Sequence, residues 1–120
     1  MIEPIPDLPD SVVGFTAKGK VTARDYESII IPAVEAVFAR HGKIRFLYHL
    51  GKEFSGLDGG AAWDDAKLGL KHLTGWERVA VVSDVEWIRG ALRIFGLAMP
   101  GHVRVFHDAE LADAIGWIRE

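Results

Sequence analysis

Polar side chains that could take part in chemistry follow three apolar segments of this sequence. They form three pairs, one after each segment: Tyr48-His49, Ser83-Asp84 and His107-Asp108. If the segments are neighbouring parallel strands, the pairs share the edge at which α/β proteins bind ligands, and a His beside an Asp is a candidate acid/base group. Asp84 and Asp108 also directly precede expected helices, where an aspartate N-cap accepts hydrogen bonds from unpaired N–H groups. We favour the capping interpretation and predict that the chain is not an enzyme.

The five histidines show no spacing typical of a metal site, with no i, i+4 pair and no HExxH pattern. The absence of cysteine excludes disulfides, thiolate zinc sites and thiol catalysis. We therefore expect no metal and no cofactor. Residues 52–56 are expected to form a loop before a helix, but the GxxxxGK[ST], GxGxxG and GxSxG patterns are all missing.

Composition narrows the classes of partner. The chain has 14 basic and 17 acidic residues, a net charge of −3, and its Lys and Arg residues are scattered. A nucleic-acid binder normally clusters such residues against phosphates, so no nucleic-acid partner is expected. No apolar stretch approaches the ~20 residues that span a bilayer. Residues 1–10 are acidic, carry three prolines and do not resemble a secretory signal, so we expect a cytoplasmic location.

The elements that must position these residues alternate along the chain. Strands are expected over 2–5, 11–17, 44–50, 79–83 and 103–106, and helices over 23–41, 59–73, 85–99 and 109–119. The first two strands predict an antiparallel hairpin, and the later alternation predicts parallel βαβ units. Residues 79–82 are apolar on both faces, which is typical of a central strand. Pro32 predicts a kink or a broken turn within the first helix.

The helix expected over 85–99 is unusually apolar. Its only charged residues are Glu86, Arg89 and Arg93, whereas an outer helix is usually polar over about half of its circumference. It is either deeply packed, or part of it lines a hydrophobic pocket or a protein interface. Trp63 follows four small residues, 59–62, which would allow another backbone or a ligand to approach closely.

Several stretches in combination resemble the SpoIIAA-like family of small bacterial proteins, which is related to STAS domains. They are Asp25-Tyr26, Ile31-Pro32-Ala33, Lys43-Ile44-Arg45, Trp63-Asp64-Asp65, Lys67-Leu68-Gly69-Leu70-Lys71-His72, Glu77-Arg78-Val79-Ala80-Val81-Val82-Ser83-Asp84, Trp87-Ile88 and Val103-Arg104-Val105-Phe106. The resemblance covers nearly the whole chain and implies a single SpoIIAA-like (STAS-type) domain over residues 1–120. It implies an α/β fold, a βα superhelix with a mostly parallel sheet of four to five strands. An antiparallel N-terminal hairpin strand and four flanking helices complete that fold.

The resemblance and the apolar helix together lead to our first functional hypothesis. The fold is similar to CRAL-TRIO domains, which hold hydrophobic ligands between sheet and helix. We expect a non-catalytic module that binds a small hydrophobic or lipid-like ligand, a protein partner, or both, through the 85–99 helix and the adjacent sheet. The candidate ligand-binding residues are Trp63, Trp87, Ala91, Leu92, Phe95 and His49. A homodimer through the same helix is a further prediction.

The alternative is a phosphorylation-controlled regulatory protein. Anti-sigma-factor antagonists of the STAS type use a phosphorylated serine in an Asp-Ser-Ser/Ala-Gly-like loop. The nearest match here is Ser55-Gly56, preceded by Glu53 and Phe54, which makes Ser55 the candidate regulatory residue. A third hypothesis is an enzyme that uses His49 or His107 with Asp84.

Overall fold

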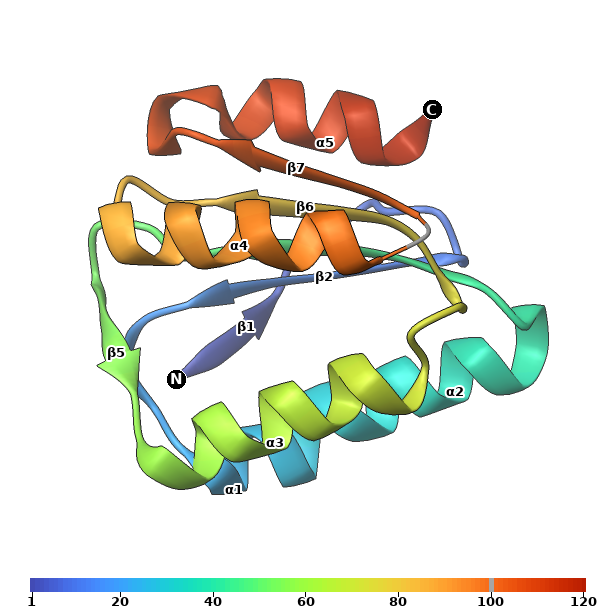
Figure 1. The fold of residues 1–120 in the computed structure, drawn as a ribbon, viewed down its shortest axis with the longest axis horizontal. Helices are drawn as coiled ribbons and strands as arrows, with labels where there is room; N and C mark the ends of the chain where they lie inside the picture. Colours follow the sequence, from blue (N-terminus) through green and yellow to red (C-terminus); the bar gives the residue numbers. More distant parts are fainter. Residues whose placement is uncertain (100) are drawn as a thin grey trace.

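A computed structural model describes residues 1–99 and 101–120, and a five-stranded sheet forms its centre. The strand order is β1 (Ile2–Pro4), β2 (Val12–Ala17), β4 (Ile44–His49), β6 (Trp76–Val82) and β7 (His102–Phe106). β1 pairs antiparallel with β2, and every other pair is parallel. The predicted mostly parallel sheet with an antiparallel N-terminal pair is therefore confirmed (Figure 1).

Helices cover both faces of this sheet (Figure 1). The larger core lies beneath α2 (Ile31–His41), α3 (Gly59–Lys71) and α4 (Glu86–Ala98), and the smaller one beneath α5 (Leu111–Arg119), which follows the short 3₁₀ turn η2 (Asp108–Glu110). Alternate strand residues enter the two cores, as the two-residue period of a strand requires: Phe46 and Tyr48 point to the larger core and Leu47 to the smaller. Among the residues that the structure describes, no helix combines the length and apolar character needed to cross a bilayer.

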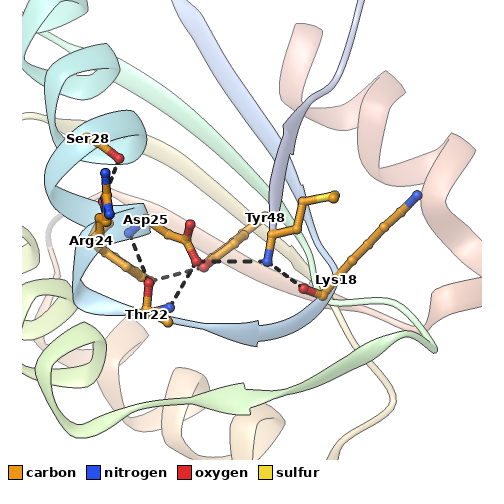
Figure 2. Close-up of polar contacts among 8 residues, drawn as sticks. Lys18, Thr22, Arg24, Asp25, Ser28 and Tyr48 are labelled. Carbon is orange, nitrogen blue, oxygen red and sulfur yellow. Dashed lines mark hydrogen bonds and ion pairs between the residues drawn. The ribbon is translucent and has the colours of Figure 1, made fainter.

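The first helical segment is interrupted as Pro32 led us to expect. It consists of α1 (Ala23–Asp25), the π-helical turn η1 (Tyr26–Ile30) and α2. A capping box begins it: Thr22 Oγ1 accepts from the Asp25 N–H at 3.2 Å, and the Asp25 carboxylate accepts from the Thr22 N–H at 3.0 Å (Figure 2). The Ile31 N–H then reaches back to the Tyr26 carbonyl, one residue further than in an α-helix. Pro32, which has no N–H to donate, lies in the first turn of α2 directly after this π-helical turn.

A separate two-stranded parallel ribbon was not predicted. It pairs β3 (Gly19–Val21) with β5 (Phe54–Leu57). The expected loop over 52–56 is therefore wrong from Phe54 onward. Gly56 has φ 133°, a conformation that only glycine adopts readily, which is why the segment has the composition of a loop. Its backbone groups nevertheless find partners in β3, a segment remote in the sequence.

The ribbon places the beginnings of two helices side by side. β3 leads into α1, and β5 leads into α3. At this point the helices approach so closely that a Cβ on Gly60 would lie 2.7 Å from the Ala23 Cβ. The close contact fixes the beginning of α1 relative to the beginning of α3, and with it the relative positions of the side chains that follow in the two helices.

Candidate functional site

A cavity of about 340 Å³ lies between the sheet and helices α3 and α4. Its lining is mostly aromatic and aliphatic and comes from η1, β4, β5, β6, α3 and α4. The lining residues are Tyr26, Ile30, Phe46, Tyr48, Leu50, Phe54, Leu57, Asp65, Ala66, Leu68, Gly69, Trp76, Val79, Val81, Trp87, Ile88, Ala91, Leu92 and Phe95. Small-molecule sites run from about 300 to 1,000 Å³, and a dry cavity of about 150 Å³ already holds benzene. The cavity is therefore large enough for a short aliphatic or aromatic ligand.

Four of the six predicted ligand-binding residues lie together on this cavity. Trp87, Ala91 and Phe95 are spaced four apart along α4, which places them on one side of the helix, and Leu92 lies beside them. The structure thus brings the predicted α4 residues into a single wall.

Trp63 and His49 are not among the lining residues. Trp63 lies on the outer side of α3, is 64% exposed, and has the Lys67 amine 5.9 Å from its ring centre. His49 ends β4 with its Nδ1 3.3 Å from Thr16 Oγ1. The cavity gives these two predictions no support.

Helix α4 is packed on one side and bare on the other. Ile88 is buried in the larger core, whereas Ile94 and Leu97 are 72% and 89% exposed. Trp87 is 67% exposed although it also lines the cavity. The surplus of apolar residues predicted for residues 85–99 is therefore divided between the cavity wall and the solvent-facing surface.

A polar network that was not predicted from the sequence reaches the otherwise apolar cavity. The Tyr26 hydroxyl donates to Asp65 Oδ1 at 2.9 Å and lies 3.1 Å from the Tyr48 hydroxyl. A phenol has one proton, so Tyr48 must be the donor to Tyr26. All three residues line the cavity. A partial signal was present in the sequence: Asp65 lies four residues after Ala61 and three before Leu68, which are both buried on α3, although the aspartate that is itself buried is Asp64.

Burial controls the protonation of this network. It raises the pKa of the Asp65 carboxyl group, against the opposing effect of the hydrogen bond from Tyr26. Asp65 as a residue is exposed, and its carboxyl group lies at the cavity wall, where it accepts the hydrogen bond from Tyr26. Burial also raises the pKa of Tyr26 and of Tyr48, so both hydroxyl groups keep their protons and act as donors.

The sheet positions Tyr48 in this network. Parallel registers place Phe15 of β2, Tyr48 of β4 and Val81 of β6 abreast, so their side chains share the face beneath α3 and α4. Figure 2 shows Tyr48 extending from the sheet toward Asp25 at the beginning of the helical segment. The negative charge of Asp25 makes a further contribution to the raised pKa of Tyr48.

The polar edge predicted at the strand ends exists, but its aspartates do not cap helices. The N-cap of α4 is Val85, without a side-chain bond, and Asp108 is itself the first residue of η2. Asp84 instead joins the ends of β6 and β7: its Oδ1 accepts from the Asp108 N–H at 3.1 Å and lies 3.0 Å from His107 Nδ1. These two contacts lower the pKa of Asp84.

The arrangement of side chains at this polar edge gives little support for catalysis. The side chains of His107 and Asp84 are both more than half exposed, so the pair meets bulk solvent. His49 contacts Thr16 instead of Asp84. In residues 1–99 and 101–120, no group of three or more His, Asp or Glu side chains is arranged to hold a metal ion. Ser55 lies exposed in β5.

Comparisons with known proteins extend over nearly the whole chain. The sequence model of the SpoIIAA-like family matches residues 12–119. The crystal structure of an uncharacterized DUF3478-family protein with a SpoIIAA-like fold, from Shewanella loihica PV-4, is 35% identical with a TM-score of 0.76. The match covers 98% of this chain and 92% of that one. A search among curated proteins found no significant match.

A second solved structure is similar in fold alone. It is the anti-sigma factor antagonist SpoIIAA in its unphosphorylated form, with 10% identity and a TM-score of 0.63. The match covers 97% of this chain and 98% of that one.

Proposed function

The chain belongs to the SpoIIAA-like family, and on this premise we propose that it is a non-catalytic binding module for a small apolar molecule. The ligand occupies the cavity between the sheet, α3 and α4. The observation that supports this proposal is the cavity itself, about 340 Å³ with mostly aromatic and aliphatic walls. Removing apolar surface from water contributes roughly 25 cal/mol per Å², so filling such a space favours binding. A cytoplasmic location belongs to the same proposal, because a chain without cysteine suits a reducing compartment.

Binding of simple aliphatic probes tests the proposal directly. Trp76 and Trp87 line the cavity, so their fluorescence should change when decanol or decane enters it. Native mass spectrometry of the purified protein should show the bound probe. A clean apo mass, together with no fluorescence change and no thermal shift across the panel, would remove the proposal.

A matched pair of variants locates the binding. Ala66 and Ala62 are both exposed, one turn apart on α3, but only Ala66 lines the cavity. We expect Ala66→Trp to obstruct the cavity and weaken decanol binding at least about tenfold, which corresponds to 1.4 kcal/mol. Ala62→Trp should leave the affinity unchanged. Equal affinities in the two variants would place the probe elsewhere.

The exposed side of α4 supports a second candidate function, docking of a protein partner or of a second copy. Trp87, Ile94 and Leu97 present large apolar side chains to solvent, and contiguous exposed patches usually mark interaction surfaces. Leu97→Glu should abolish any concentration-dependent association seen by analytical ultracentrifugation. Its control is Arg119→Glu at the end of α5. A monomer at all concentrations would exclude the homodimer.

Regulation through Ser55 is the alternative to ligand binding. Its support is the exposed hydroxyl in β5, in a fold shared with an anti-sigma factor antagonist whose structure was solved unphosphorylated. A phosphate there would lie close in sequence to Asp58, the N-cap of α3, and would repel it. Partner capture with Ser55→Ala and Ser55→Asp proteins tests this role. Identical capture by both proteins would exclude it.

A further inference from the structure

We propose that the cavity selects amphiphiles whose polar end donates hydrogen bonds, an alkylammonium ahead of an alcohol, and that Asp65 receives this end. The inference rests on the proposed function, since it specifies the chemistry of the ligand in the same cavity. A carboxylate-headed chain is disfavoured by the same network.

The direction of the hydrogen bonds supports this assignment. Tyr48 donates to Tyr26, and Tyr26 donates to Asp65 Oδ1, so both phenolic protons are already used. The network therefore ends at a carboxylate with acceptor capacity to spare. In the described residues, no protein group donates to Asp65 Oδ2, so this oxygen is available to a donor that a ligand brings.

The charges around the network independently support the assignment of Asp65 as the receiving group. In residues 1–99 and 101–120, Asp65 takes part in no ion pair. Lys67, the lysine of α3 that is nearest in sequence, has its amine 3.6 Å from Asp64 instead. Besides Asp65, the charge that acts on Tyr48 is that of Asp25, which is also negative. Asp65 therefore has no cationic partner among the described residues, and a ligand cation in the cavity would supply one through a charge-assisted hydrogen bond.

The order of head groups follows from these two facts. An ammonium supplies both hydrogen-bond donors and the missing positive charge, and a hydroxyl supplies a donor alone. A ligand carboxylate supplies neither, and it would place a second negative charge beside Asp65. The aliphatic remainder of each ligand meets the same apolar walls, so the polar end decides the difference.

Fluorescence titration of the wild-type protein at neutral pH with decylamine, decanol, decanoate and decane tests the order. We expect decylamine to bind at least about tenfold more tightly than decanoate, with decanol between them; charge-assisted hydrogen bonds are the strong ones. Asp65→Asn keeps the size of the side chain and removes the charge, so decylamine should weaken at least about tenfold and decanoate should tighten. Asp113→Asn, an exposed site on α5 away from the cavity, is the control and should leave the order unchanged.

The outcomes separate the two proposals. If none of the probes binds, the proposed function fails. If the probes bind with equal affinity, or decanoate binds most tightly, the head-group inference is overturned and the apolar cavity remains. An unchanged order in a folded Asp65→Asn protein also overturns it. The wild-type order decides the matter even if that variant does not fold.

Discussion

Gly69 provides a direct test of the space between α3 and α4. It lines the cavity, and a Cβ there would lie 3.8 Å from the Cε1 and Cζ atoms of Phe95, an ordinary contact distance. Gly69→Ala should therefore be accommodated without displacement of α4. Gly69→Leu adds three further carbons beyond that Cβ, and these should occupy part of the volume that we assign to a ligand.

The expected stabilisation can be worked out from two contributions. Alanine is more favourable than glycine in a helix interior by about 0.8–1.0 kcal/mol. The methyl group also becomes buried against Phe95, which contributes up to roughly 0.8 kcal/mol. Gly69→Ala should thus raise the free energy of unfolding by about 1–2 kcal/mol. The bond from Trp76 Nε1 to the Gly69 carbonyl, at 3.2 Å, involves the backbone and is retained.

Urea unfolding and decanol titration measure the two effects separately. The matched control is Gly116 in α5, where a Cβ meets nothing within 4 Å, so Gly116→Ala should gain only the helix contribution of about 0.8–1.0 kcal/mol. Gly69→Leu should remain folded and lose decanol affinity at least about tenfold, while Gly116→Leu keeps it. A Gly69→Ala protein less stable than wild type would refute the packing described between α3 and α4. Full decanol affinity in Gly69→Leu would refute the cavity as the binding site.

Three further predictions concern stability. Burial raises the pKa of Asp65 above its usual 3.8, so the folded state binds this proton more tightly than the unfolded chain, and the resulting stabilisation is lost as pH rises through the raised pKa. Asp65→Asn should remove this decline in the free energy of unfolding, measured by urea unfolding from acidic to mildly alkaline pH, whereas the control Asp113→Asn should show the same decline as wild type. Parallel stability–pH curves for wild type and Asp65→Asn would contradict the reasoning. Arg45 donates to Glu77 at 2.6 Å and to the Ile118 carbonyl at 3.1 Å, so Arg45→Met should lower the free energy of unfolding by about 1.5–3 kcal/mol. Arg24 is exposed, so the control Arg24→Met should change the free energy of unfolding by less than about 0.5 kcal/mol. An equal loss of stability in the Arg45 and Arg24 variants would show that Arg45 does not hold α5. A Cβ on Gly101 would collide with the Trp76 carbonyl, so Gly101→Ala should lower the free energy of unfolding, measured with heat or urea, by about 1–3 kcal/mol. Gly59 has open space around it, so Gly59→Ala should cause no such loss. Equal stabilities of the two variants would disprove the Gly101 contact.

The regular part of the fold was predictable because its signals are local. The apolar run in β6 indicated a strand covered on both faces, and Gly42, with φ 71°, ends α2 as expected. The helix expected over 85–99 is present as α4, and the apolar residues that make it unusual are divided between the cavity wall and the exposed surface. Each of these predictions needs only the residues of a single element.

The remaining features depend on pairings between distant segments. The β3–β5 ribbon joins Gly19 to Phe54, and neither short strand has an apolar pattern of its own. The contact between Tyr26 and Asp65 requires the relative placement of two helices, one of which contains a π turn. Asp84 precedes a helix in sequence, yet the N–H of Asp108 on the neighbouring strand end is its partner. Composition gives no measure of such distances.

The small ribbon has a consequence for how homologues are compared. Because β5 leads directly into α3, one residue gained or lost between them would turn every α3 side chain by about 100° around the helix axis. Asp65 would then swing away from Tyr26 even though neither residue had changed. Sequence alignments across this family should therefore treat a gap near residues 52–58 as a change in which α3 side chains face the cavity. Identity at the cavity positions alone does not ensure that two members have the same cavity lining.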